Sequence, residues 1–137
     1  MRLTSFTDYG LRMLMRLASA PGTAFSTAEL AEEFDLSRNH LSKIMQHLAR
    51  AGMVETRRGN GGGAVLAKAP EDMRLGDLVA LLEEDQALVE CFGLGGTCTI
   101  NGRCRLKGRL RGAQAAFRAD LNRSTLADIA LPAPQPA

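Results

Sequence analysis

All three cysteines of this 137-residue chain lie in one short, glycine-rich stretch, residues 91–104. Six residues separate Cys91 from Cys98 and five separate Cys98 from Cys104, so the paired Cys-x-x-Cys knuckles of a zinc ribbon are missing. An odd number of thiols also leaves a disulfide framework one partner short. Structural cysteines would instead be scattered over core-facing positions.

The pattern therefore favours a metal or iron–sulfur site, while a redox disulfide with one free thiol, or three inert thiols, stays open. Iron–sulfur clusters usually have four thiolate ligands, so three cysteines require a fourth ligand from elsewhere or an open position.

Composition is consistent with a reducing compartment. Apolar residues make up 45% of the chain, but they form no run long enough to span a membrane. Residues 1–8 are polar and lack the apolar core of a secretion signal. We therefore expect a cytoplasmic protein without membrane contact, in which clustered cysteines favour metals over structural disulfides.

The net charge of +2 conceals a strong segregation of charge along the chain. Residues 36–58 carry five basic residues and one acidic residue, and residues 69–102 carry seven acidic residues and one basic residue. Residues 103–123 are again basic, with seven cations and one acid. Basic stretches are often only solvated helix faces, but the first of these coincides with a pattern typical of DNA binding.

Apolar periodicity predicts three helices in the N-terminal part. The first runs over about residues 5–19, and the second begins with a capping box formed by Ser26 and Glu29. After a very short turn, Ser37 caps a third helix that ends at Gly52. Two short helices joined by a tight turn, the second of them basic, predict a helix-turn-helix.

The polar side of the third helix has the residue types that read DNA. Side chains in the first turn of such a helix can reach base edges, and later basic residues can contact phosphates. The alternative is a solvated helix in an ordinary bundle. The DNA contacts predicted on this helix are Ser37, Arg38, Asn39, His40, Ser42, Lys43 and His47.

A β-hairpin is predicted after the third helix. Residues 53–58 and 64–67 have strand character, and the glycine-rich residues 59–63 between them form a turn. This is the wing of a winged helix, and Arg57, Arg58 and Asn60 near its tip are predicted to contact DNA. A phosphate-binding P-loop is excluded because no Lys-Ser/Thr pair and no helix follow the glycines.

The rest of the chain is predicted to hold a helix with an acidic end, the cysteine loop and a long helix over about residues 105–123. The apolar stripe of that last helix must be covered, and the same helix of a second chain would cover it in a two-fold dimer. The expected fold is mainly α: a winged helix-turn-helix with a long C-terminal dimerisation helix and a cysteine cluster loop. The expected parts are a DNA-binding domain at 1–70, the cluster loop and dimerisation helix at 71–130, and a disordered tail at 131–137.

Four segments together resemble one known family. The opening at residues 1–12, the helix start at 36–43, the wing turn at 59–63 and the cysteine loop at 90–106 are similar to those of the Rrf-type winged-helix regulators. Within the family the chain is most similar to the nitric-oxide-sensing repressors. The resemblance covers about residues 1–125, and its specificity lies in the order and spacing of the segments.

The resemblance implies a homodimer in which each chain binds an iron–sulfur cluster, a 4Fe–4S cluster in preference to a 2Fe–2S cluster. It implies that Cys91, Cys98 and Cys104 are ligands and that Asp8 from the partner chain supplies the fourth. From the residues alone, Asp8 is equally a helix-start carboxylate favoured by the helix dipole. Arg12, one turn later, is expected to pair with Asp8 when that carboxylate is not a ligand.

Relatives of the IscR type carry a histidine three residues after the last cysteine, where this chain has Lys107. A lysine is a poor iron ligand at neutral pH because it stays protonated. The resemblance therefore implies a nitric-oxide-sensing, cluster-dependent repressor that binds palindromic double-stranded operator DNA as a homodimer and releases it when the cluster is nitrosylated. Iron-responsive (RirA-type) and cluster-status (IscR-type) regulators are the alternatives within the family. A redox or electron-transfer protein and a metal-free thiol switch are alternatives outside it, and we expect no enzymatic activity.

Overall fold

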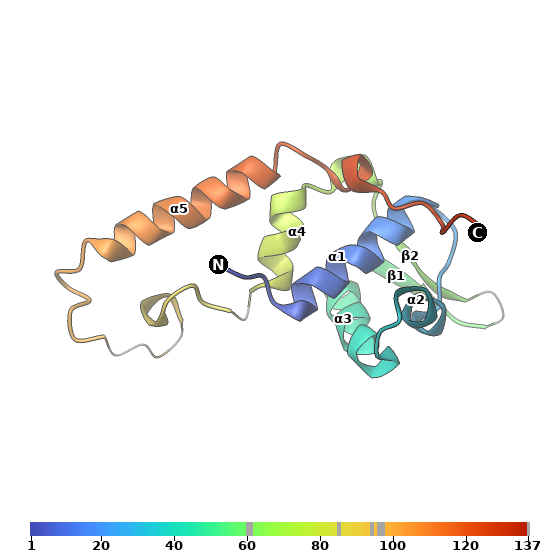
Figure 1. Cartoon of the computed structure of the whole chain (residues 1–137), viewed down its shortest axis with the longest axis horizontal. Helices are drawn as coiled ribbons and strands as arrows, with labels where there is room; N and C mark the ends of the chain where they lie inside the picture. Colours follow the sequence, from blue (N-terminus) through green and yellow to red (C-terminus); the bar gives the residue numbers. More distant parts are fainter. Residues whose placement is uncertain (60–61, 85, 94, 96–97, 137) are drawn as a thin grey trace.

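The structure is a computed structural model that describes residues 1–59, 62–84, 86–93, 95 and 98–136. Its N-terminal part holds three helices, α1 (Ser5–Ala18), α2 (Thr27–Phe34) and α3 (Arg38–Arg50), as predicted. Figure 1 shows α2 and α3 packed against one side of α1. In the described part of the chain, no helix is both long enough and apolar enough to cross a membrane.

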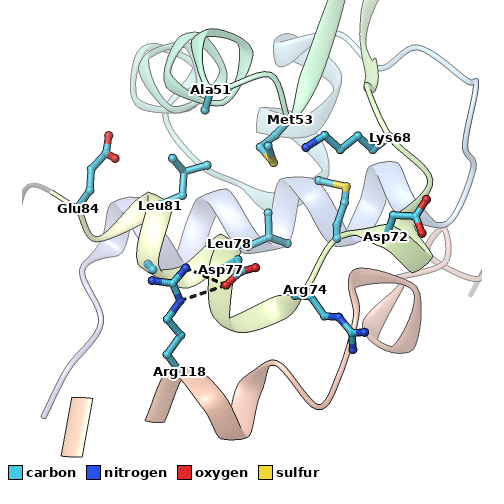
Figure 2. A pocket seen from close by; sticks show the side chains of 12 residues that line it. Ala51, Met53, Lys68, Asp72, Arg74, Asp77, Leu78, Leu81, Glu84 and Arg118 are labelled. Atoms are coloured by element: carbon cyan, nitrogen blue, oxygen red, sulfur yellow. Dashed lines mark hydrogen bonds and ion pairs between the residues drawn. The ribbon is translucent and has the colours of Figure 1, made fainter. Parts of the chain in front are cut away.

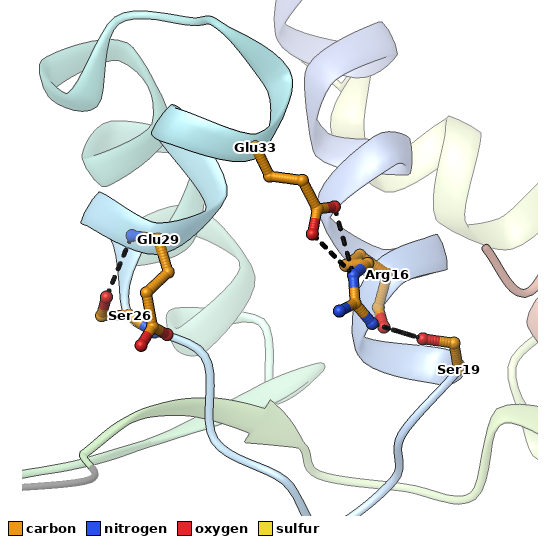
Figure 3. A network of polar contacts seen from close by, with 5 residues as sticks. All are labelled: Arg16, Ser19, Ser26, Glu29 and Glu33. Atoms are coloured by element: carbon orange, nitrogen blue, oxygen red, sulfur yellow. Dashed lines mark hydrogen bonds and ion pairs between the residues drawn. The ribbon is translucent and has the colours of Figure 1, made fainter. Parts of the chain in front are cut away.

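Side-chain caps fix where these helices begin. The hydroxyl of Thr4 accepts a hydrogen bond from the Thr7 amide at the start of α1. Ser26 and Glu29 form the predicted capping box of α2, which Figure 3 shows. The hydroxyl of Ser37 accepts from the amide of His40 at the start of α3. Each cap satisfies a backbone donor that has no partner within its helix, so the local sequence places all three N-termini.

The core forms where the apolar stripes of these helices meet. Met13, Leu14 and Leu17 of α1 are almost completely buried, as are Ile44 and Leu48 of α3. Burial of a side chain of this size contributes roughly 1.5–3 kcal/mol to folding. The opposite side of α3 faces solvent, whereas α1 is surrounded by other elements and exposes only Ser5 and Asp8.

A polar bridge ties α1 to α2 beside this core. The Nε atom of Arg16 donates to both carboxylate oxygens of Glu33 at 3.0 and 3.1 Å, and its guanidinium lies 4.6 Å from the centre of the Phe25 ring. The Arg16 and Glu33 side chains are only 11% and 19% exposed (Figure 3). This bridge fixes α2 relative to α1, and α2 in turn supports α3.

The wing is a two-stranded antiparallel sheet of β1 (Val54–Arg57) and β2 (Gly63–Leu66). Its register pairs Val54 with Leu66 and Arg57 with Gly63. Phe25, in the segment before α2, exchanges backbone hydrogen bonds with Ala64 and attaches the wing to the helical core. Gly63 is required at this contact, since a Cβ there would lie 2.3 Å from the Phe25 carbonyl oxygen. The predicted hairpin is therefore present, and the predicted turn residue Asn60 lies outside the described residues.

The second half starts with a 3-10 turn, η1 (Pro70–Asp72), and α4 (Leu75–Leu82), and continues through η2 (Glu90–Phe92) to α5 (Leu106–Leu121). Figure 1 shows α4 between α1 and α5, with the cysteine loop joining the far ends of α4 and α5. In this single chain α5 buries none of its residues. The predicted long helix is thus present, and its apolar stripe is largely uncovered.

After α5 the chain turns back to the N-terminal core through η3 (Leu126–Ile129). Leu126 is fully buried, and its amide donates to the Met73 carbonyl at 2.8 Å. The amide of Leu131 donates to the Met15 carbonyl, also at 2.8 Å. Leu131, the first residue of the predicted tail 131–137, thus lies on α1 through a backbone hydrogen bond that sequence periodicity does not reveal.

One polar network joins α4 to α5. The carboxylate of Asp77 accepts two hydrogen bonds from Arg118, at 3.1 and 2.9 Å, and one from Asn122 at 2.9 Å. Figure 2 shows Asp77 and Arg118 facing each other beside the pocket that α4 lines. The hydrogen bonds from Asn122 and Arg118 lower the pKa of Asp77 below its ordinary value. The carboxylate is therefore held in its charged form, and the joint does not depend on protonation near neutral pH.

Gly76 allows the backbones of α4 and α5 to approach at this joint. A Cβ at position 76 would lie 2.2 Å from the Arg118 carbonyl oxygen, whereas a Cβ at Gly108 of α5 would meet no described atom within 4 Å. We predict that Gly76→Ala lowers the free energy of unfolding by about 1–3 kcal/mol, because α5 must move away from α4. Gly108→Ala is the matched control and should raise it by up to about 1 kcal/mol through helix propensity. Urea unfolding of both variants measures the difference, and equal midpoints would contradict the close approach.

Candidate DNA-reading helix and cysteine loop

The first turns of α3 present polar side chains to solvent. Ser37, Arg38, Asn39 and Lys43 are exposed, and Ser42 is half-buried. They point outward because Leu41, Ile44, Met45 and Leu48 occupy the buried side of the same helix. A helix N-terminus also carries free backbone amides and the positive end of the helix dipole, both of which favour an anion such as phosphate. The structure therefore brings together most of the predicted DNA-contacting residues of α3 on one accessible surface.

His40 and His47 lie elsewhere, and their predicted exposure on the outward side of α3 is corrected. The ring of His40 lies 5.3 Å from that of Tyr9 and 6.5 Å from that of Phe6, so α1 partly covers it. The side chain of His47 is only 16% exposed. The physical reason is helix geometry: His40, Ile44 and His47 follow one another at steps of four and three residues, which place them on one side of a helix. Both histidines therefore border the buried stripe.

The wing adds a second set of cations. Arg57 and Arg58 are exposed at the end of β1, next to the hairpin turn. A tight turn at Gly52, whose φ is +78°, connects α3 to β1, and the Met53 amide donates to the Leu48 carbonyl at 2.9 Å. This short connection keeps the wing beside α3. The two elements can therefore contact one duplex together.

The three cysteines are free thiols of intermediate exposure. Cys91 lies in η2, and Cys98 and Cys104 flank two tight turns closed by hydrogen bonds from Asn101 to the Cys98 carbonyl and from Arg103 to the Ile100 carbonyl. Three cysteine sulfurs are the soft donors that iron–sulfur clusters require, so the chemistry of the donors fits the group that the family resemblance implied. Among the residues that the structure describes, however, no three His, Cys, Asp or Glu side chains are gathered as a metal site.

Two contacts from α5 hold the cysteine loop, and sequence analysis did not identify them. The Nζ atom of Lys107 donates to the Asn101 side chain at 2.8 Å. The Arg111 guanidinium lies 5.2 Å from the centre of the Phe92 ring, next to Cys91 in sequence. Cation–π contacts of this kind contribute roughly 0.5–1 kcal/mol at exposed sites. Lys107 thus contacts the cysteine loop through the side chain of Asn101.

Asp8 lies on α1 and is paired with Arg12. The two oxygens of Asp8 accept from Nε and Nη2 of Arg12 at 3.1 and 3.0 Å, as the spacing of four residues predicted. Both side chains are about half exposed, so the pair contributes at most about 1 kcal/mol and can be opened readily. Asp8 is therefore an accessible carboxylate near the start of α1.

The acidic end of α4 makes contacts that sequence analysis also missed. The carboxylate of Glu83 accepts a hydrogen bond from the Thr4 amide, and Nε2 of His47 lies 3.3 Å from a carboxylate oxygen of Glu84. The acidic run 83–85 was visible in the sequence, and its position between a helix and the cysteine loop was the only available signal. Its partners on α1 and α3 are distant in sequence and could not be inferred.

A capped, basic helix in a three-helix core, followed by a wing, defines the winged helix-turn-helix class of DNA-binding proteins. Within this class, residues 3–131 match the family model Rrf2, which is described as an iron-dependent transcriptional regulator. The chain belongs to the Rrf2 family of transcriptional regulators. It is 42% identical over 133 residues to the HTH-type transcriptional regulator NsrR of Shouchella clausii, an alignment covering 96% of this chain and 89% of the relative.

Solved structures show the same architecture. CymR, described as the global cysteine regulator of Bacillus subtilis, superposes with a TM-score of 0.73 at 26% identity, covering 95% of this chain and 96% of that one. IscR of T. potens superposes with a TM-score of 0.72 at 26% identity, covering 93% and 85%. The predicted fold class and family are thereby confirmed.

Proposed function

We propose that this chain is a nitric-oxide-sensing, iron–sulfur-cluster-dependent repressor that binds palindromic operator DNA as a homodimer. The observation that carries the proposal is the loop of three free thiols that begins at the end of α4, in a chain with an exposed basic recognition helix. The similarity to the transcriptional regulator NsrR over nearly the whole chain supports a role in transcription, and the resemblance to the nitric-oxide-sensing members of the family supports nitric oxide as the signal.

DNA reading is assigned to α3 and the wing. Arg38 and Asn39, in the first turn of α3, can reach base edges in the major groove, and Lys43, Arg57 and Arg58 can neutralise phosphates. Arginine pairs with guanine through two parallel hydrogen bonds, whereas lysine acts on phosphate as a point charge. We therefore assign sequence specificity to Arg38 and general affinity to the other cations.

Dimerisation is assigned to α5. Leu106 is 60% exposed and Phe117 36% exposed, and no residue of α5 is buried in the single chain. A groove between the N-terminal segment, α4 and α5 includes Leu3, Val79 and Phe117 in its lining. A second copy of α5 covers this apolar surface by symmetry. The two-fold dimer then presents two copies of α3 to half-sites about one helical turn of DNA apart.

The ligands we propose for the cluster are Cys91, Cys98 and Cys104, with Asp8 of the partner subunit as the fourth. When bound, an iron–sulfur cluster supplies iron that reacts with nitric oxide. Asp8 must leave Arg12 to become a ligand, and the half-exposed ion pair makes this exchange inexpensive. Loss of the cluster would let Asp8 pair with Arg12 again and would detach α1 from the cysteine loop of the partner subunit. α1 packs directly against α3.

An iron-responsive regulator is the second candidate, because the matching family model is described as iron-dependent. The two candidates differ in signal and share the fold and the ligands. Purified dimer bound to operator distinguishes them: nitric oxide should release the DNA quickly under the first candidate, with iron chelation or oxygen acting more slowly. Release by a chelator and none by nitric oxide would establish the second.

The DNA assignment predicts different effects for two cations of α3. Arg38→Ala should weaken binding to an operator duplex selected from random sequence by about tenfold to a hundredfold and affect random duplex much less. Lys43→Ala should weaken both and lower the slope of log affinity against log salt by about one. Arg123→Ala, whose side chain is 82% exposed beyond α5, is the control and should change neither. An equal loss on operator and random DNA for Arg38→Ala would remove it as a base reader.

The cluster assignment predicts the metal content of the protein. Wild-type chain purified without oxygen should be coloured and contain iron and acid-labile sulfide, and alanine at Cys91, Cys98 or Cys104 should abolish assembly. The far-ultraviolet circular dichroism of each variant should stay helical, since none of the three thiols belongs to the buried core. A fully coloured alanine variant would contradict the ligand set, and a colourless wild type would favour a metal-free thiol switch.

The assignment of Asp8 to the partner subunit predicts the behaviour of mixed dimers. A carboxylate is a harder ligand for iron than a thiolate, so Asp8→Ala should retain the cluster and change its optical spectrum. In one mixed dimer, the chain with cysteines lacks Asp8 and its partner keeps Asp8 without the cysteines; the spectrum should match wild type. In the converse dimer, one chain keeps both and its partner has neither; the spectrum should be altered. The opposite pattern would show that Asp8 acts within its own chain.

A further inference from the structure

The end of α4 and the turn that follows it, residues 81–84, contact both α1 and α3. Leu82 is buried in a notch where a Cβ on Gly10 of α1 would lie 2.8 Å from its Cδ2 atom and 3.2 Å from Cγ2 of Ile44 on α3. Glu83 accepts a hydrogen bond from the backbone amide of Thr4. This is the last α-helical segment before the cysteine loop, and residues 85–90 connect the two.

His47 makes the contact between this turn and the recognition helix. Its Nε2 atom lies 3.1 Å from the Leu81 carbonyl oxygen and 3.3 Å from a carboxylate oxygen of Glu84. Both neighbours can only accept hydrogen bonds, so Nε2 must carry a proton and donate. The Leu81 carbonyl belongs to the final turn of α4, where carbonyls lack partners within the helix. His47 thus caps α4 from α3.

A contact with α1 also restrains the His47 ring. It meets the Phe6 ring of α1 edge-on, with the ring centres 5.4 Å apart and the planes at 80°. The side chain is 16% exposed, so a displacement of the α4 terminus must move the ring or break its hydrogen bond. His47 is in the third turn of the helix whose first turn carries Arg38, so the two residues belong to one continuous helix of 13 residues.

We propose that His47 is a positioning residue that couples the cysteine loop to the recognition helix. The inference rests on the proposed function and adds the route by which the state of the loop reaches DNA within one chain. An ordered loop holds the last turn of α4 in place, and His47 then holds α3 in the orientation that binds the operator. When the loop is released, the cap on Leu81 loosens and α3 loses that restraint.

The test compares operator affinity with and without the cysteines in three His47 backgrounds. The probe is a duplex selected from random sequence by anaerobically purified wild-type protein. The reference state is the chain with alanine at all three cysteines. In wild type, the intact loop should strengthen binding within the range of about 5–150-fold that is usual for coupled sites. His47→Leu removes the donor. The ratio of operator affinity with the cysteines to that without them should then fall about tenfold, or to one where the wild-type ratio is below ten. His47→Gln, which retains an amide donor, should restore most of this ratio.

A direct DNA contact by His47 predicts a different result. His47→Leu would then weaken binding by the same factor with and without the cysteines, leave the ratio unchanged and overturn the inference. Thermal unfolding of each variant checks that the chain folds. If His47→Leu does not fold, Glu84→Gln takes its place, because Glu84 is half exposed and loses only its charge; it should lower the ratio in the same direction, and an unchanged ratio would overturn the inference.

Hydrogen exchange separates failure of this inference from failure of the proposed function. If wild type binds the operator equally well with and without the cysteines, the proposed cluster dependence is wrong. Amide hydrogen exchange in residues 78–93 then tests the coupling between α4 and α3 by itself. Operator DNA should slow exchange there in wild type and not in His47→Leu, and equal slowing in both would overturn the inference. If no duplex is selected at all, the proposed function fails and the coupling role fails with it.

Discussion

The rest of the structure depends on the close contact of α1, α3 and α4 at Gly10. Leu82 of α4 and Ile44 of α3 approach the same spot of α1, where a Cβ on Gly10 would lie 2.8 Å from Cδ2 of Leu82 and 3.2 Å from Cγ2 of Ile44. Interiors packed at this density transmit displacements, because they have no free volume in which to absorb them. α3 and α4 therefore pack against the same region of α1, and a displacement of either helix acts on the other through this contact.

The N-terminal half could be predicted from the sequence because short-range rules determine it. Capping serines, the apolar period of 3.6 and the glycine-rich hairpin turn each specify structure within a few residues, and the structure contains α1 to α3 and the wing as expected. The outward position of Arg38, Asn39 and Lys43 follows from the same periodicity. The family resemblance added the ligands of the cysteine loop, which periodicity cannot supply.

What the sequence could not supply are contacts between segments far apart in the chain. His47 was predicted to lie on the polar side of α3, because the sequence could not reveal that the end of α4 covers this residue. The chain returns from α5 to α1 through single backbone hydrogen bonds, such as that from the Leu131 amide to the Met15 carbonyl. Such bonds do not depend on the residue types that form them, so the sequence does not indicate them. Two contacts to the cysteine loop likewise come from outside it, from Lys107 to Asn101 and from Arg111 to Phe92.

These contacts give α4 a central position in the molecule. Near its first turn, Asp77 holds α5 through Arg118 and Asn122, and in its last turn Leu81 to Glu84 contact α1 and α3. The cysteine loop connects the far ends of α4 and α5, so loop, α4 and α5 enclose a triangle with the joint at Asp77 as one corner (Figure 1). A change in the span of the loop must then alter the angle at that joint or shift the last turn of α4. Asp77 and Arg118 are both about half exposed, as Glu84 is, so the exposure of these charged pairs does not make one end of α4 firmer than the other. The end that carries Glu84 also holds the buried Leu82 and the hydrogen-bonded Glu83, so a shift of that end acts on α1 and α3 through several contacts at once.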